Sequence, residues 1–339
     1  MEQTSQNSES TTNGLADKKS KFVRDNKKKL KEKIEALDHE GYNEFIEEAK
    51  KLKSDFFIAG SDKDSMIKVN DWIVMPKAIQ ELTCIPGLPC GLITMAHGDS
   101  DAGKSTFCNE ALASTQKDDG IAILFLSELK FNNQRAAAMG IKVDGGPGSL
   151  IKYYPKTIEQ VGDYIFDVAR IIDKAKTKKK VCIVWDSIGS TPCENELNVA
   201  RSNFSMDAAK AITGVLRKTQ ALIRDKSIAF VMINQIYDKT GITFGKKTTT
   251  KGGKAPRYYN ALNLEFTKIG RIRPPGVKAP EPFCGIKTKI SVEKNHLGQP
   301  FREIEADIDW KGFVFNRKPE YAPRGFYDSI AKVSKKKEE

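Results

Sequence analysis

Continuous apolar segments alternate with helical ones through the middle of the chain. The clearest of them contain no charged residue and lie at residues 91–96, 121–126, 181–185 and 228–233. Residues 206–222, between the last two, are long enough for a helix. A continuous apolar strand is buried on both faces, so the pattern predicts an α/β fold with a mostly parallel sheet covered by helices on both faces. Apolar positions alternate more strictly at 261–269 and 286–292, which predicts further strands that extend the sheet.

The two ends of the chain differ from this core in composition. The first residues are rich in Ser, Thr, Asn and Gln, which is typical of disordered segments. Apolar residues then recur at helical spacing, as at Leu30, Ile34 and Leu37, and predict short helices that either pack on the core or dock on a neighbouring subunit. We therefore expect a disordered N-terminus, a helical extension, an α/β core and a short C-terminal tail at residues 1–20, 21–70, 71–316 and 317–339.

A glycine-rich loop connects the first apolar segment to a predicted helix that begins at Lys104. Its residues match the pattern G-x-x-x-x-G-K-[ST], which binds phosphates when a strand precedes it and a helix follows. The glycines let backbone N–H groups close around phosphate oxygens, and the helix N-terminus adds positive potential. Lys104 supplies a charge for the β- and γ-phosphates, and the Ser105 hydroxyl is a ligand for Mg²⁺. The loop predicts ATP or GTP binding by Gly98, Asp99, Ser100, Asp101, Ala102, Gly103, Lys104, Ser105 and Thr106.

Polar residues also follow the other apolar segments. Asp186 follows one of them, where we expect a carboxylate that holds Mg²⁺ together with Ser105. Glu128 follows another and is the candidate for polarising the attacking water, while Asn234 and Gln235 are expected to end the last strand and contact the γ-phosphate. Ligands of open parallel sheets bind at the carboxyl ends of the strands, so these groups together predict a site that hydrolyses its nucleotide.

The charge balance points to an anionic partner. The chain of 339 residues carries 56 Lys and Arg against 44 Asp and Glu, a net charge of +12, and nucleic acid is the first candidate. No apolar stretch is long enough for a membrane span, and the polar N-terminus lacks the core of a signal peptide. We therefore expect a cytoplasmic protein without a membrane partner.

Cations concentrate between Lys239 and Arg257, where lysines are interspersed with glycines. No Asp or Glu occurs in residues 239–264, so nothing in that stretch repels phosphate. Glycine allows close approach of the backbone to a ligand. The segment is therefore either a loop that binds single-stranded DNA or an exposed flexible loop with solvated lysines.

These motifs resemble those of the RecA family of recombinases, including its phage UvsX branch. The resemblance starts at GLPCGLIT and continues through GDSDAGKST, LFLSELKF, VWDSIGS and VMINQIYDKTGITFGKKTTTKGGKAPRYYNALNLEFTKIGRI to KTKISVEKNHLGQPF. It covers about residues 85–313, roughly two-thirds of the chain. It implies a RecA-type core whose protomers assemble head to tail into a helical filament, with ATP and Mg²⁺ at each interface.

The resemblance also implies roles for single residues. Glu128 would be the catalytic carboxylate, and Gln235 would sense the γ-phosphate and signal to the loop after it. Lys294 falls where the family has a lysine that reaches into the neighbouring protomer's site and neutralises charge on the phosphoryl oxygens. His296 stands where bacterial members have a second such lysine; because histidine is only partly charged near neutral pH, hydrolysis is expected to be weaker or pH-sensitive. Arg135 replaces an adenine-stacking tyrosine, although a guanidinium can also stack on a base.

The implied DNA-binding face has two parts. A mobile loop supplies apolar groups that hold bases apart and cations that follow the backbone, and a preceding helix supplies polar side chains spaced three and four apart on one face. The candidate DNA-binding residues are Met206, Lys210, Thr213, Arg217, Ile236, Tyr237, Lys239, Gly252, Gly253, Lys254 and Arg257.

The implied function is that of a DNA-dependent ATPase that forms a helical filament on single-stranded DNA. It would pair this strand with homologous duplex DNA and exchange strands during recombination and repair. Single-strand-binding and loader proteins are candidate partners, in a bacterial cell or a phage-infected host. Two alternatives stay open: a ring helicase on the same core, which electron microscopy would reveal as closed rings, and a regulator that binds ATP tightly but not DNA.

Overall fold

The computed structural model describes residues 41–47, 69, 71–128, 130–198, 204–238 and 248–322. The chain divides into two units, residues 1–66 and 67–339, and in the first unit only a helix over residues 41–47 is described. The positions Leu30, Ile34 and Leu37 lie outside the described residues. So do the expected disordered N-terminus, Lys239 and most of the expected C-terminal tail.

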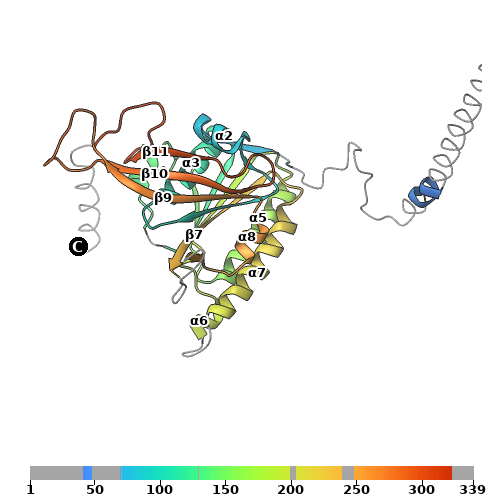
Figure 1. The fold of residues 1–339 in the computed structure, drawn as a ribbon. Helices are drawn as coiled ribbons and strands as arrows, with labels where there is room; N and C mark the ends of the chain where they lie inside the picture. The colour runs from blue at the N-terminus through green and yellow to red at the C-terminus, as the bar shows by residue number, and fades with distance from the viewer. Residues whose placement is uncertain are drawn as a thin grey trace, which may run out of the picture. The chain divides into compact units, whose positions relative to one another are not determined.

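A large sheet forms the centre of the second unit (Figure 1). The strands are β1 (Trp72–Val74), β2 (Gly87–Pro89), β3 (Ile93–Gly98), β4 (Ile121–Leu126), β5 (Ile151–Tyr153), β6 (Val181–Asp186), β7 (Ile228–Asp238), β8 (Thr248–Thr250), β9 (Leu262–Ile272), β10 (Gly285–Asn295), β11 (Glu303–Asp309) and β12 (Gly312–Phe313). Strands β1 and β2 pair in a separate two-stranded sheet. The order across the large sheet is β12-β11-β10-β9-β3-β7-β6-β4-β5, and β8 pairs with β7 outside this path. From β9 to β5 neighbouring strands are parallel, whereas β10, β11 and β12 add antiparallel pairs at the other edge.

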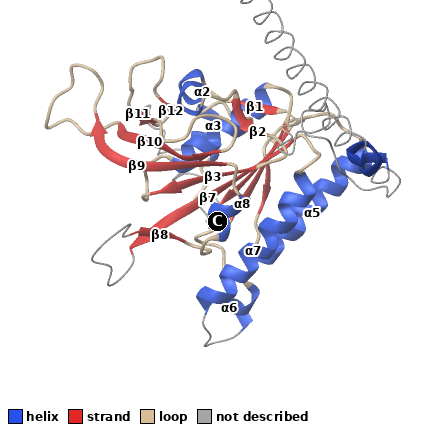
Figure 2. Ribbon diagram, turned by 45° about the vertical axis from the view of Figure 1, so that its right-hand side comes forward, coloured by secondary structure: helices blue, strands red, loops and turns tan. Residues whose placement is uncertain are grey.

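Helices cover both faces of this sheet (Figure 2). They are α2 (Lys77–Thr83), α3 (Lys104–Lys117), α4 (Asn133–Ala138), α5 (Ile158–Ala175), α6 (Glu194–Asn198), α7 (Phe204–Ile223) and α8 (Ala255–Tyr259). Helix α3 contributes Phe107 and Leu112 to the core on one face, and α5 and α7 contribute Ile165 and Ile212 to the core on the other. The predicted fold class, a mostly parallel sheet between two helical layers, is therefore confirmed.

The period of a β-strand explains why one sheet has two cores. Successive side chains of a strand point to opposite faces. In β4, Leu124 and Leu126 pack in the core with α3, while Ile123 and Phe125 pack in the core with α5 and α7. Both faces are apolar, so the strand appears in the sequence as an unbroken apolar segment.

Strand β7 corrects one prediction. Asn234 and Gln235 were expected to end the strand, but it continues to Asp238. Its last residues pair with β8, with Ile236 opposite Thr250 and Tyr237 opposite Thr249. This antiparallel pairing supplies backbone hydrogen bonds that extend the strand beyond the polar Asn-Gln pair. The apolar pattern of the sequence does not reveal this pairing, so the predicted strand was too short. Within the described residues, no helix is both long and apolar enough to cross a membrane.

Candidate functional site

The glycine-rich loop lies between the end of β3 and the start of α3. Gly98 and Gly103 have φ values of +140° and +102°, a region that favours glycine. A Cβ atom on Gly98 would lie 1.9 Å from the Phe266 carbonyl oxygen, so this position also requires close approach of β9. These two glycines allow the chain to turn sharply from the strand into the helix.

Lys104 points back into this loop from the first turn of α3. Its Nζ donates a hydrogen bond of 3.0 Å to the Gly98 carbonyl and another to the Asp99 carbonyl. The side chain is only 7% exposed. Burial lowers the pKa of Lys104, and the negative charge of nearby Asp186 opposes this shift. The loop thus holds an ammonium group among backbone dipoles at the N-terminus of a helix, where a phosphate binds favourably.

Two oxygen groups suited to a hard cation meet beside Lys104. The Ser105 hydroxyl donates a hydrogen bond of 2.9 Å to Asp186 Oδ2, which joins the start of α3 to the end of β6. Burial raises the pKa of Asp186 to about 6. A carboxylate and a hydroxyl are ligands that Mg²⁺ accepts, and a nearby divalent charge would favour the ionised carboxylate. The donor set therefore fits the predicted Mg²⁺ site.

Glu128 lies at the centre of a hydrogen-bond network at the strand ends. Its Oε1 accepts a hydrogen bond of 3.0 Å from Gln235 Nε2 and one of 2.9 Å from the Ser187 hydroxyl. Lys130 Nζ lies 3.2 Å from Oε2. Partial burial acts to raise the pKa of Glu128, but the hydrogen bonds from Ser187 and Lys130 outweigh it and the pKa falls below its ordinary value. Glu128 is therefore ionised at neutral pH and can orient a water molecule.

A pocket of about 590 Å³ connects these groups. Its lining includes the loop from Ser100 to Thr106 together with Glu128, Asp186 and Gln235. The structure thus brings the predicted phosphate, Mg²⁺ and water-activating groups to one cavity, from positions far apart in the sequence.

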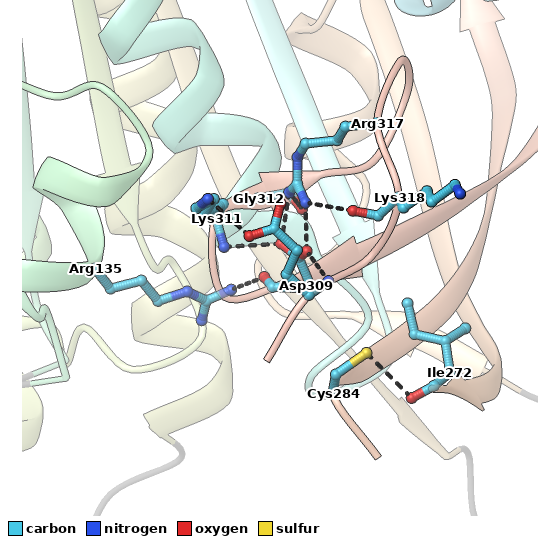
Figure 3. Close-up of polar contacts among 9 residues, drawn as sticks. Arg135, Ile272, Cys284, Asp309, Lys311, Gly312, Arg317 and Lys318 are labelled. Carbon is cyan, nitrogen blue, oxygen red and sulfur yellow. Dashed lines mark hydrogen bonds and ion pairs between the residues drawn. The ribbon is translucent and has the colours of Figure 1, made fainter. Parts of the chain in front are cut away.

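Arg135 lines the same pocket, and Figure 3 shows its guanidinium group directed toward Asp309. Its Nη2 is 3.5 Å from the Thr106 hydroxyl and 3.5 Å from the Asp309 carbonyl, and its Nε is buried without a hydrogen-bond partner among the described residues. The Asp309 carboxylate is held by Arg317, which keeps the pKa of Asp309 low despite its burial. Asp309 and the neighbouring Trp310 also line the pocket, and sequence reasoning missed both because no motif marks this end of β11.

Lys294 and His296 lie near the end of β10 and do not line this pocket. Lys294 Nζ donates hydrogen bonds of 2.9 Å and 3.3 Å to the carbonyls of Arg257 and Tyr258, at the end of α8. His296 is exposed, but partial loss of water around its ring and the charge of Lys294 both lower its pKa. Within one protomer these two cations do not line the cavity that contains Lys104, so any role in hydrolysis requires a neighbouring protomer.

The described members of the predicted DNA-binding set lie on α7, at the end of β7, in the turn before α8 and on α8. Lys210 and Arg217 are exposed on α7, whereas the Thr213 hydroxyl donates a hydrogen bond of 2.7 Å to the Ala209 carbonyl. The exposed members of the remaining set include Met206, Tyr237, Gly253 and Lys254, while Ile236 and Arg257 are half-buried.

Gly252 has a packing role in the structure. Its φ is +90°, and a Cβ atom there would lie 2.9 Å from Ile212 Cδ1 on α7. The Lys251 side chain next to it donates a hydrogen bond of 3.0 Å to the Gly189 carbonyl, and the Lys251 carbonyl accepts one of 2.9 Å from Asn234. The turn before α8 is therefore connected both to α7 and to the strand ends around Glu128, which sequence reasoning did not foresee.

Comparisons with known proteins agree with this geometry. Residues 49–314 match the family model of the RecA N-terminal domain. The chain is 32% identical over 271 residues to the protein RecA of Ureaplasma parvum serovar 3, covering 79% of this chain and 76% of that one. It is 30% identical over 274 residues to the protein RecA of Mycoplasma mobile, covering 80% of this chain and 78% of that one. It is 31% identical over 227 residues to the protein RecA of Chlorobaculum tepidum, an alignment that covers 66% of this chain and 61% of that one. A phosphate loop, an ionised carboxylate and a strand leading to a basic segment, together with these matches, establish that the chain belongs to the RecA family of recombinases.

Proposed function

We propose that this RecA-family recombinase hydrolyses ATP to control a helical filament on single-stranded DNA, which pairs with homologous duplex DNA and exchanges strands. The hydrogen bond of 3.0 Å between Glu128 and Gln235 is the main support. Glu128 belongs to the nucleotide pocket, and Gln235 belongs to β7, which continues into the basic segment at residues 239–254. A change in the partner of Glu128 would therefore be transmitted directly to that segment.

In the nucleotide pocket, Lys104 and the backbone of residues 98–103 would bind the phosphates of ATP. Ser105 and Asp186 would hold Mg²⁺, which when bound neutralises phosphate charge. Glu128 would orient the attacking water and accept its proton, and Gln235 would exchange its contact with Glu128 for one with the γ-phosphate. Arg135 would lie against the base, where its guanidinium plane can stack.

Lys294 and His296 would act on the nucleotide of the neighbouring protomer. A cation close to the transferring phosphoryl group stabilises the charge that develops in the transition state. The carbonyls of α8 that hold Lys294 Nζ belong to the helix after the basic segment. Binding of DNA to that segment would therefore change the position of Lys294, which gives a route by which DNA stimulates hydrolysis.

The first test is the rate of ATP hydrolysis with and without single-stranded DNA, at several protein concentrations and low salt. Phosphate contacts weaken steeply with ionic strength, so low salt is needed to detect them. The proposal predicts a rate that rises with DNA and rises cooperatively with protein, because each site needs two protomers. A rate that ignores DNA, with ATP still bound tightly, would favour the regulator instead. Closed rings in electron micrographs would favour the helicase.

His296→Lys should raise DNA-dependent ATP hydrolysis severalfold at about pH 7.5, because the lowered pKa of His296 leaves it mostly neutral there. The difference from the wild-type protein should shrink as the pH falls below the lowered pKa of His296, where the imidazole becomes protonated. Initial rates across this pH range measure the effect. His296→Gln, which is neutral at every pH, is the matched control. Its hydrolysis rate relative to the His296→Lys protein should not rise at acidic pH, as the wild-type rate should. Equal rates for all three proteins would remove His296 from the catalytic machinery.

Lys254→Ala should weaken binding to single-stranded DNA severalfold and reduce the slope of log affinity against log salt by about 0.7, the value for one phosphate contact. Fluorescence anisotropy of a labelled oligonucleotide at several salt concentrations measures both quantities. Lys117→Ala, at the exposed end of α3, removes the same charge away from the proposed DNA face. If the two variants show the same affinity and slope, Lys254 contacts no phosphate.

Partners and origin follow from the same proposal. A filament on single-stranded DNA competes with single-strand-binding proteins, so loader proteins are expected partners. A phage origin is a prediction from the polar N-terminus and the loose fit to bacterial members of the family.

A further inference from the structure

A polar cluster outside the nucleotide pocket lies where β3, β9 and β10 are adjacent. It contains His97, Glu265 and Glu293, whose potential ligand atoms all lie within 4.8 Å of one another. His97 is directly opposite Glu265 in the parallel pairing of β3 with β9. The His97 side chain is 0% exposed and that of Glu293 is 21% exposed. A fully buried imidazole between two carboxylates is costly unless the group is paired or bound to an ion.

Glu293 lies at a β-bulge of β10 and contacts this cluster. Val292 pairs with Leu264 and Lys294 pairs with Asn263, so Glu293 is an extra residue in β10. Such bulges re-aim side chains and occur next to functional sites. Here Glu293 Oε2 lies 2.8 Å from His97 Nε2 and accepts a hydrogen bond of 2.8 Å from Asn263 Nδ2. Strand alternation places Glu293 on the same face as Ser291, which pairs with Glu265, so both carboxylates lie on one side of the sheet.

Buried polar atoms around the cluster lack partners. Asn263 is 3% exposed, and its Oδ1 has no hydrogen-bond partner among the described residues. Exchange of the amide oxygen and nitrogen of Asn263 would direct this oxygen to the cluster as a further ligand. His97 Nδ1 also lacks a partner in the described part of the chain, as does Oδ1 of Asn234, which occupies the register position of His97 on β7. Histidines that bind metals commonly use such an oxygen to hold their second nitrogen.

We propose that His97, Glu265 and Glu293, assisted by Asn263, form a binding site for a divalent transition-metal ion such as Zn²⁺. One neutral imidazole with carboxylate oxygens is a donor set for such ions. The ion would replace the proton shared between His97 and Glu293, and that proton would be released to solvent.

Access to this site is provided by a pocket of about 510 Å³ that Asn263, Glu293 and Lys294 help to line. Arg257 Nη2 lies 3.8 Å from Glu293 Oε2, beyond hydrogen-bond distance, and its side chain is 40% exposed. It can therefore turn toward solvent when an ion binds. A bound ion would connect His97 of β3, which directly precedes Gly98, to Glu293 of β10, which directly precedes Lys294. It would therefore make the connection between the phosphate loop and Lys294 more rigid.

Titration of the chelator-treated, nucleotide-free protein with ZnCl₂ by calorimetry tests this site. The wild-type protein should bind one equivalent, and its melting temperature should rise because only the folded state presents the site. Glu293→Gln and Glu265→Gln keep the shape of the side chains and should each weaken Zn²⁺ binding by at least about tenfold. Glu303→Gln is the matched control, since Glu303 lines the same pocket outside the cluster and should leave binding unchanged.

Co²⁺ absorption distinguishes this site from binding by a thiol. Cys84 is the exposed free cysteine of the described residues, and Cys84→Ser should bind the metal like the wild-type protein. Ligation by nitrogen and oxygen gives weak visible bands without an intense thiolate charge-transfer band. Circular dichroism and melting in chelator establish that each variant is folded. Absence of stoichiometric binding to the wild-type protein, unchanged affinity in both glutamine variants, or a thiolate band lost in Cys84→Ser would each overturn the proposal.

Discussion

Replacing Lys104 with alanine should abolish ATP-dependent binding to single-stranded DNA and reduce ATP hydrolysis by at least about 10²–10³-fold, the usual cost of removing a group that stabilises transition-state charge. The ammonium group of Lys104 lies within the loop at the N-terminus of α3, held by the Gly98 and Asp99 carbonyls. No other side chain of the loop from Gly98 to Thr106 carries a positive charge, and Asp99 and Asp101 add negative ones. Without Lys104 the loop would therefore repel the β- and γ-phosphates. Binding of a fluorescent ATP analogue and of labelled DNA measures the two losses.

Lys117→Ala is the control for this prediction, because it removes the same charge from the exposed end of the same helix. It should keep ATP-dependent DNA binding and a normal hydrolysis rate. Circular dichroism of Lys104→Ala must match the wild-type spectrum, since the side chain is buried. A folded Lys104→Ala protein that still forms filaments only when ATP is present would disprove the assignment of the phosphate loop.

Glu128→Gln should lower ATP hydrolysis by about 10²–10⁴-fold, the contribution of a well-placed general base, while ATP and DNA still bind. The glutamine keeps the size of the side chain and an oxygen that can accept from Ser187, but it has no carboxylate to take the proton of the attacking water. ATP would persist in the site, and release from DNA would slow. Hydrolysis assays together with dissociation from labelled DNA, after addition of unlabelled competitor, measure both effects.

Glu81→Gln provides the comparison, because Glu81 lies on α2 with a 64% exposed side chain and its carboxylate is 3.6 Å from Lys77 Nζ. This variant should hydrolyse ATP and leave DNA at wild-type rates. Normal ATP turnover in Glu128→Gln would show that Glu128 is not the catalytic carboxylate. Fast release of this variant from DNA would show that release does not depend on hydrolysis.

Local patterns in the sequence were sufficient for the fold class and the nucleotide loop. Strands buried on both faces appear as continuous apolar segments, which is why β4 could be predicted with its observed bounds. The phosphate loop is local as well, since its turn, its charge and its helix start lie within residues 98–105. Asp186 and Glu128 could be predicted because the carboxyl ends of parallel strands face one crevice.

The tertiary structure decided which distant groups meet. The extension of β7 beyond Gln235 depends on its pairing with β8, and no residue within β7 itself marks it. Asp309 and Trp310 reach the nucleotide pocket because antiparallel strands are added at one sheet edge. His97 and Glu293 come together through the register of β3, β9 and β10, and register is a relation between segments that a single segment does not encode.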